Sequence, residues 1–118
     1  CERYSTDERD LSGMSHEEQM EKMKNCFKQI YRLIKTSNFD EKIFYPVIFK
    51  VTHARKGTRG IIDMDMEFQK IAHEVGMVTW DKLFNQLHSP WGTVNWERNY
   101  INKYVQKNYE VNLTFVKF

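Results

Sequence analysis

The first clear pattern of apolar positions along the chain begins at residue 15. Ser15, followed three positions later by Glu18, forms a capping box that marks the start of a helix. Apolar side chains then recur at spacings of three and four, at Met20, Met23, Phe27, Ile30 and Ile34. This spacing predicts an amphipathic helix over about residues 16–36, with its apolar face packed on a small sheet.

The middle and the end of the chain have patterns typical of strands. Residues 47–52 are mainly β-branched and aromatic, and residues 61–66 alternate between apolar and polar side chains. Because a glycine-containing turn separates these two stretches, residues 47–66 are predicted to form a β-hairpin. A further alternation over residues 109–115 predicts a C-terminal strand.

Helical spacing returns after residue 67. The apolar positions predict three helices, at about residues 68–75, 79–88 and 96–105, with Gly76 as the C-cap of the first and Thr79 as the N-cap of the second. The predicted class is therefore α+β: one small domain in which a long N-terminal helix and a three-helix region pack on a small antiparallel sheet, formed by the hairpin and the C-terminal strand. Residues 1–14 are polar and are predicted to be a flexible N-terminal tail, and residues 15–118 the single globular domain.

Basic side chains are unevenly distributed along the 118 residues. The formal net charge is +2. Residues 41–60 carry five basic side chains and one acidic side chain, whereas residues 1–40 and residues 61–118 each have one more acidic than basic side chain. The positive excess therefore comes from one short stretch that contains the tip of the predicted hairpin.

This basic tip and the helices after it favour a nucleic-acid-binding module. Arginine and lysine beside glycine can reach phosphates, and residues 69–87 have the layout of a helix-turn-helix, with Ala72 at the crossing and Gly76 in the turn. The candidate contact residues are Lys50, Arg55, Lys56, Arg59, Lys82, Asn85 and Gln86. The same patterns are also typical of a solvated loop and of an ordinary corner between two core helices.

The alternative function is a protein–protein interaction domain. The last third of the chain is rich in aromatic side chains, namely Trp80, Trp91, Trp96, Tyr100 and Tyr104. These could line a groove for a partner. A partner could instead add a strand beside residues 109–118.

No complete catalytic constellation is recognisable, so the chain is predicted not to be an enzyme and to have no catalytic residues. Asp63 and Asp65 alternate along the predicted strand and could hold a divalent metal ion, but the wet face of a half-buried strand has the same pattern. We therefore predict no metal and no cofactor. No small-molecule substrate is evident either.

Cysteine use and hydropathy give an expected location. Cys1 and Cys26 are too few for a disulfide framework, so they are predicted to be free thiols in a reducing compartment, which favours an intracellular protein of the cytoplasm or nucleus. No run of 18 apolar residues occurs, so no membrane span is predicted. Because the chain begins with Cys1, we interpret it as a fragment of a longer protein or as a processed product.

Overall fold

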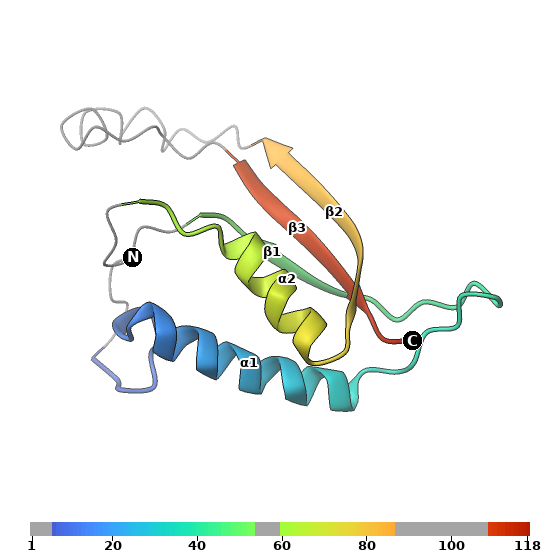
Figure 1. The fold of residues 1–118 in the computed structure, drawn as a ribbon, viewed down its shortest axis with the longest axis horizontal. Coiled ribbons are helices and arrows are strands. Elements are labelled where there is room, and N and C mark those ends of the chain that lie inside the picture. Colours follow the sequence, from blue (N-terminus) through green and yellow to red (C-terminus); the bar gives the residue numbers. More distant parts are fainter. Residues whose placement is uncertain (1–5, 54–59, 87–108) are drawn as a thin grey trace.

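A computed structural model describes residues 6–53, 60–86 and 109–118. These residues form a small α+β domain, which confirms the predicted class (Figure 1). After a 3₁₀ turn over Leu11–Gly13, the elements are helix α1 (His16–Leu33), strand β1 (Val47–Val51), helix α2 (Met64–Glu74), strand β2 (Val78–Gln86) and strand β3 (Tyr109–Val116). Among the described residues, no helix is long and apolar enough to cross a membrane.

The last strand of the chain lies in the centre of the sheet. The strand order is β1-β3-β2, and β3 pairs antiparallel with both of its neighbours. Val51 of β1 and Phe84 of β2 both pair with Val111. Because β1 and β2 each run opposite to β3, they are parallel to one another, and α2 is part of the crossover between them.

Both helices cover the same face of this sheet. The ring of Phe27 in α1 stacks on Phe49 of β1, with centroids 4.7 Å apart, and meets Phe115 of β3 at 5.9 Å. The ring of Phe68 in α2 lies edge-on to both Phe27 and Phe49. Leu113, which pairs with Phe49, is fully buried in the same core.

Helix α1 begins at the predicted residue. The Ser15 hydroxyl accepts a hydrogen bond from the backbone N–H of Glu18 at 3.2 Å, as expected for an N-cap. Phe27 has no exposed surface, and Ile30 is half-buried against the core. The predicted packing of this helix face on the sheet is therefore confirmed, although the helix ends at Leu33.

The predicted hairpin over residues 47–66 is wrong. Residues 47–51 are a strand, but the second half of the hairpin is replaced by the start of α2, at Met64 with Asp63 as its N-cap. Met64 packs against the core, so the helical spacing of the following apolar residues extends back to this position. The partner of β1 is instead β3, and this long-range pairing leaves no local pattern in the sequence.

The predicted helix over residues 79–88 is also wrong, because residues 78–86 form β2. The register between β2 and β3 shifts between Thr79 and Asp81, so Trp80 is the extra residue of a β-bulge. The bulge breaks the alternation of inward and outward side chains. As a result, Trp80, Leu83 and Phe84 have a helix-like spacing within a strand, and the helix-turn-helix prediction fails. The helix predicted at residues 96–105 lies outside the described residues.

The chain reverses direction tightly between α2 and β2. The N–H of Gly76 bonds to the carbonyl of His73 at 3.1 Å, and the N–H of Met77 bonds to the carbonyl of Ala72 at 2.9 Å, which is a Schellman motif. Gly76 has a φ of 102°, so the predicted role of this glycine in ending the helix is confirmed. The ring of Tyr31 lies against it, since a Cβ built on Gly76 would be 3.3 Å from that ring.

Candidate nucleic-acid interface

At one end of the sheet, the ends of all three strands lie close to the start of a helix. The carboxyl ends of the parallel strands β1 and β2 lie at this end, where β3 begins and α2 has its first turn. We refer to this part of the molecule as the carboxyl edge.

The carboxyl edge contains a shallow cavity of about 420 Å³, which we call the edge pocket. The pocket is lined by polar and apolar side chains from α2, β2 and β3, namely Asp63, Asp65, Met66, Lys82, Phe84 and Tyr109. Its position follows from the register, because Lys82 and Phe84 point to the helix-covered face and Tyr109 is the diagonal neighbour of Phe84 on that face.

An ion pair forms part of the pocket wall. The Lys82 ammonium donates to the Asp65 carboxylate at 2.7 Å, and the two side chains are 31% and 17% exposed. The ammonium also lies 5.2 Å from the centre of the Phe84 ring. Lys82, a predicted nucleic-acid contact, therefore has its charge balanced by a carboxylate of the helix.

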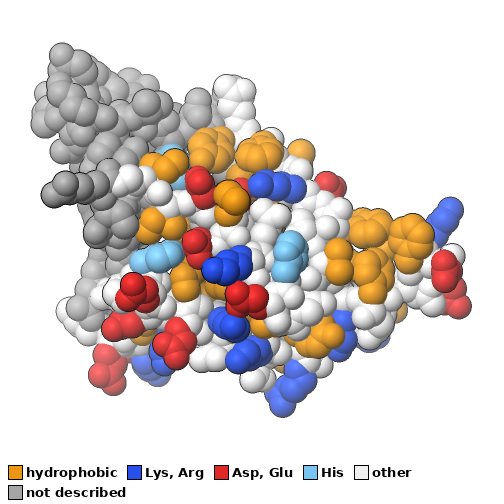
Figure 2. Space-filling view, viewed as in Figure 1, with side chains coloured by type: hydrophobic (Ala, Val, Ile, Leu, Met, Phe, Trp, Pro, Cys, Tyr) orange, Lys and Arg blue, Asp and Glu red, His pale blue; other side chains and the backbone are white. Residues whose placement is uncertain are grey.

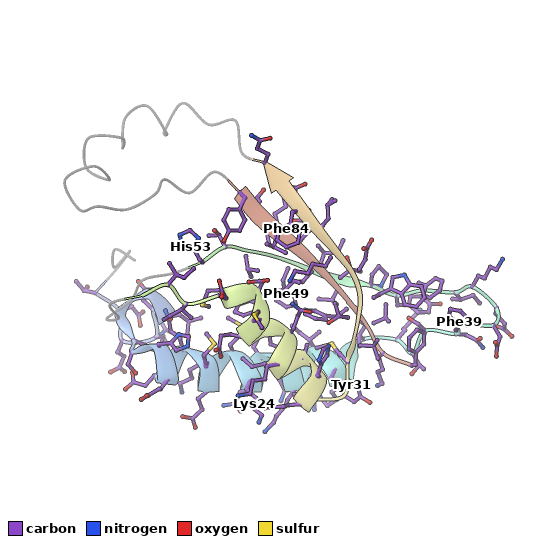
Figure 3. The ribbon with its side chains drawn as sticks, turned by 45° about the horizontal axis from the view of Figure 1, so that its top comes forward. Lys24, Tyr31, Phe39, Phe49, His53 and Phe84 are labelled. Atoms are coloured by element: carbon purple, nitrogen blue, oxygen red, sulfur yellow. The ribbon has the colours of Figure 1, made fainter. Side chains whose placement is uncertain are left out.

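A second polar contact ties the ends of β1 and β3 together. Nδ1 of His53, two residues after β1, and the hydroxyl of Tyr109 share a hydrogen bond at 3.1 Å. The two rings lie 5.7 Å apart, centre to centre. This contact fixes the Tyr109 side of the pocket, and Figure 3 shows His53 and Phe84 near the same end of the sheet.

The edge pocket leaves apolar side chains open to solvent. Phe84 is 62% exposed, although its register partner Val111 is 1% exposed. Met66, in the first turn of α2, is 63% exposed. The helices therefore cover the middle of the sheet face but leave an aromatic ring uncovered at its carboxyl edge.

The structure does not place the predicted contact residues on one surface. Lys82 and Gln86 belong to the helix-covered face of β2, whereas Asn85 belongs to the opposite face, because neighbouring residues of a strand alternate. Lys50 also lies on the outer face and is 3.9 Å from Glu110. The helix-turn-helix interface is therefore wrong. The basic residues Arg55, Lys56 and Arg59 lie outside the described residues.

Sequence reasoning missed three side chains of the carboxyl edge, His53, Phe84 and Tyr109, and it considered Asp63 only as a strand residue that could hold a metal ion. The cap role of Asp63 could have been found, because a helical period follows it directly. The meeting of His53 with Tyr109 could not, since strand order has no periodic trace in the sequence.

Within residues 6–53, 60–86 and 109–118, no three His, Cys, Asp or Glu side chains gather in a way that could hold a metal ion. Away from the carboxyl edge, the Lys24 ammonium donates to Glu74 at 2.7 Å and lowers the pKa of that carboxyl below its ordinary value.

A separate aromatic cluster lies beside the bulge of β2. The ring of Trp80 is 4.7 Å from Phe44 and 5.9 Å from both Phe39 and Phe118, centre to centre. Phe39, Trp80 and Phe118 are 62%, 44% and 47% exposed. Figure 2 shows hydrophobic side chains at the end of the molecule where the segment between α1 and β1 projects. We call these four residues the end cluster.

The structure also changes the predicted mode of strand addition. Residues 109–116 cannot accept a partner strand beside them, because β3 is already paired on both sides. The strands at the edges of the described sheet are β1 and β2. Of the aromatic residues predicted to meet a protein partner, Trp80 lies in the end cluster, and the other four lie outside the described residues.

Comparison with known proteins gives a similar fold. No family model matches the chain, and no curated protein matches it. The crystal structure of a putative DNA modification methylase from Thermus thermophilus is similar over 86% of this chain, with a TM-score of 0.62 and 13% sequence identity. The chain spans 38% of the length of that protein.

This similarity corrects one prediction from the sequence. The chain was predicted not to be an enzyme because its sequence contains no recognisable catalytic constellation. That prediction is contradicted by the comparison, since the protein that shares the fold is described as a DNA-modifying enzyme. A fold can carry a reaction whose residues leave no recognisable motif in one sequence.

Proposed function

We propose that this chain is the nucleic-acid-binding part of a DNA-modifying enzyme, and that its basic segment contacts the phosphate backbone. The basic segment is residues 50–59, which contain Lys50, Arg55, Lys56 and Arg59 and no acidic residue. The fold shared with a putative DNA modification methylase supports the class of partner.

The position of the basic segment carries the proposal. It starts in β1, and residues 54–59 join His53 to Gly60, a few residues before α2 begins. The most basic stretch of the chain is therefore attached at both ends to the carboxyl edge, which also contains the edge pocket. Arginine and lysine form strong charge-assisted hydrogen bonds with phosphates.

A salt titration of duplex DNA binding tests this proposal. Each phosphate contact releases condensed counterions, so the logarithm of affinity falls with the logarithm of salt by about 0.9 per contact. Replacing Arg55, Lys56 and Arg59 together by Ala should weaken binding and reduce this slope by roughly two to three units. Fluorescence anisotropy of a labelled duplex at several KCl concentrations measures both effects.

A matched control removes the same charge from another surface. Lys22, Lys28 and Arg32 lie on exposed positions of α1, and their replacement by Ala also removes three positive charges. Alanine suits a helix, so this variant should keep the fold. Equal loss of affinity in the two variants would indicate a general charge effect, and absence of DNA binding by the parent at low salt would refute the proposal.

The exposed end cluster favours a second function, the docking of a protein partner. Exposed aromatic side chains that gather in one place are typical of protein–protein contacts. Binding through such a surface does not weaken steeply with salt, whereas backbone contacts do. The same titration therefore separates the two functions.

A further inference from the structure

We propose that the edge pocket binds an unpaired nucleobase that carries an exocyclic amino group. Phe84 would stack on the base, and the carboxylate of Asp63 would accept a hydrogen bond from the amino group. The inference rests on the proposed function and deepens it by naming the part of the nucleic acid that enters the pocket.

The exposed ring of Phe84 is the first observation behind this inference. A phenylalanine at a helix-facing sheet position normally belongs to the core, yet Phe84 is 62% exposed. It lines the pocket together with Met66, whose side chain is also exposed. Leaving such apolar area in water is unfavourable, and a flat ligand would cover it. Every nucleobase has a π-face, and stacking on an aromatic side chain is the usual means of holding an unpaired base.

The polar lining selects among the bases. Asp63 is the N-cap of α2, but its side chain makes no capping hydrogen bond to the helix, so its carboxylate is not committed to that role. A carboxylate can only accept hydrogen bonds, so it pairs with an N–H donor such as the amino group of adenine or cytosine. Uracil and thymine have no amino group, and their one free ring N–H lies between two carbonyl oxygens that would meet the carboxylate unfavourably.

The remaining walls of the pocket are held in place. Asp65 is engaged by Lys82 at 2.7 Å, and Tyr109 by His53 at 3.1 Å, so neither needs a ligand to stay ordered. The cavity of about 420 Å³ lies within the range of small-molecule sites. The base must be unpaired and unstacked, because Phe84 would cover a face that in a duplex lies against the neighbouring base pair.

Free nucleosides test the pocket separately from the DNA contact, because they carry no phosphate. Adenosine, cytidine and uridine would be titrated into ¹⁵N-labelled protein at millimolar concentrations, with amide chemical shifts as the readout. We expect adenosine and cytidine to bind at least about fivefold more tightly than uridine, and to shift the amides of residues 63–66 and 82–84. Equal affinity for uridine, or no binding of adenosine or cytidine, would overturn the inference.

Three variants locate the contacts. Phe84→Leu should weaken adenosine binding by at least about fivefold, because the aromatic face is lost. Asp63→Asn should leave the start of α2 unchanged but remove the preference for amino-bearing bases, because the amide can donate as well as accept. Phe39→Leu is the matched control, since Phe39 is also 62% exposed but lies in the end cluster.

The variants also keep the two proposals distinct. The triple substitution in the basic segment should leave nucleoside binding unchanged, since the ligand has no phosphate. If Phe84→Leu binds adenosine as the parent does, the pocket inference is wrong even where DNA binding persists. If duplex DNA is not bound but adenosine is, the pocket stands and the backbone contact fails.

Discussion

The deletion of the Phe27 ring would test how α1 is attached to the sheet. Phe27 is completely buried, stacks on Phe49 at 4.7 Å and lies edge-on to Phe68 and Phe115. Phe→Ala changes in cores cost about 3–5 kcal/mol, and each aromatic pair adds roughly 0.5–1.5 kcal/mol to the area term. We therefore expect Phe27→Ala to lower the free energy of unfolding by about 4–5 kcal/mol, a large share of the roughly 5–15 kcal/mol of a small domain.

Urea denaturation followed by far-ultraviolet circular dichroism measures this loss. With a slope of about 2 kcal/mol/M, the midpoint should fall by roughly 2 M. Leu33→Ala is the control on the same helix, because Leu33 is 74% exposed and its loss should cost under about 0.5 kcal/mol. A cost below about 1 kcal/mol for Phe27→Ala, or equal costs for the two variants, would refute the packing argument.

Two further predictions concern the turn after α2 and its ion pair. Gly76→Ala should lower the free energy of unfolding, measured in urea, by about 1–2 kcal/mol, because the φ of Gly76 is 102° and Tyr31 lies 3.3 Å from the added Cβ. Gly60→Ala is the control and should have no such effect, because the Cβ added there has no atom within 4 Å beyond the glycine and its chain neighbours. Equal effects of the two substitutions would contradict this account. The Lys24–Glu74 pair lowers the pKa of Glu74 below 4.5, so its contribution to stability is present above that pH and is lost as the pH falls through the folded pKa. The midpoint difference between the parent and Glu74→Gln should therefore disappear in acid, and a difference that is independent of pH would exclude this ion pair as its cause.

Patterns in the sequence predicted the elements that depend on interactions between residues close together in the chain. The capping box at Ser15 and the apolar spacing after it indicated the start and the buried face of α1. Gly76 was correctly assigned to the end of a helix, because a left-handed backbone position selects glycine. The alternation over residues 109–115 likewise predicted β3.

Features that depend on distant pairing were not predicted. One extra residue at Trp80 changed the alternation of β2 into the spacing of a helix, and the pairing with β3 that makes this stretch a strand is not visible locally. The carboxyl edge was missed for the same reason. Its pocket combines Asp63, Phe84 and Tyr109, which the strand order β1-β3-β2 brings together.

The central place of β3 has a consequence for how the protein is made. Among the described strands, β1 and β2 have no partner other than β3, which is the last of the three to be synthesised on the ribosome. At about 5–20 residues per second, the nascent chain carries β1 unpaired for several seconds after this strand has emerged. The helices form from local contacts, but the sheet can assemble only after Val116 has left the exit tunnel. Sheet formation is thus a late event of synthesis, and until then the apolar faces of β1 and α1 lack the strand on which they pack in the folded domain.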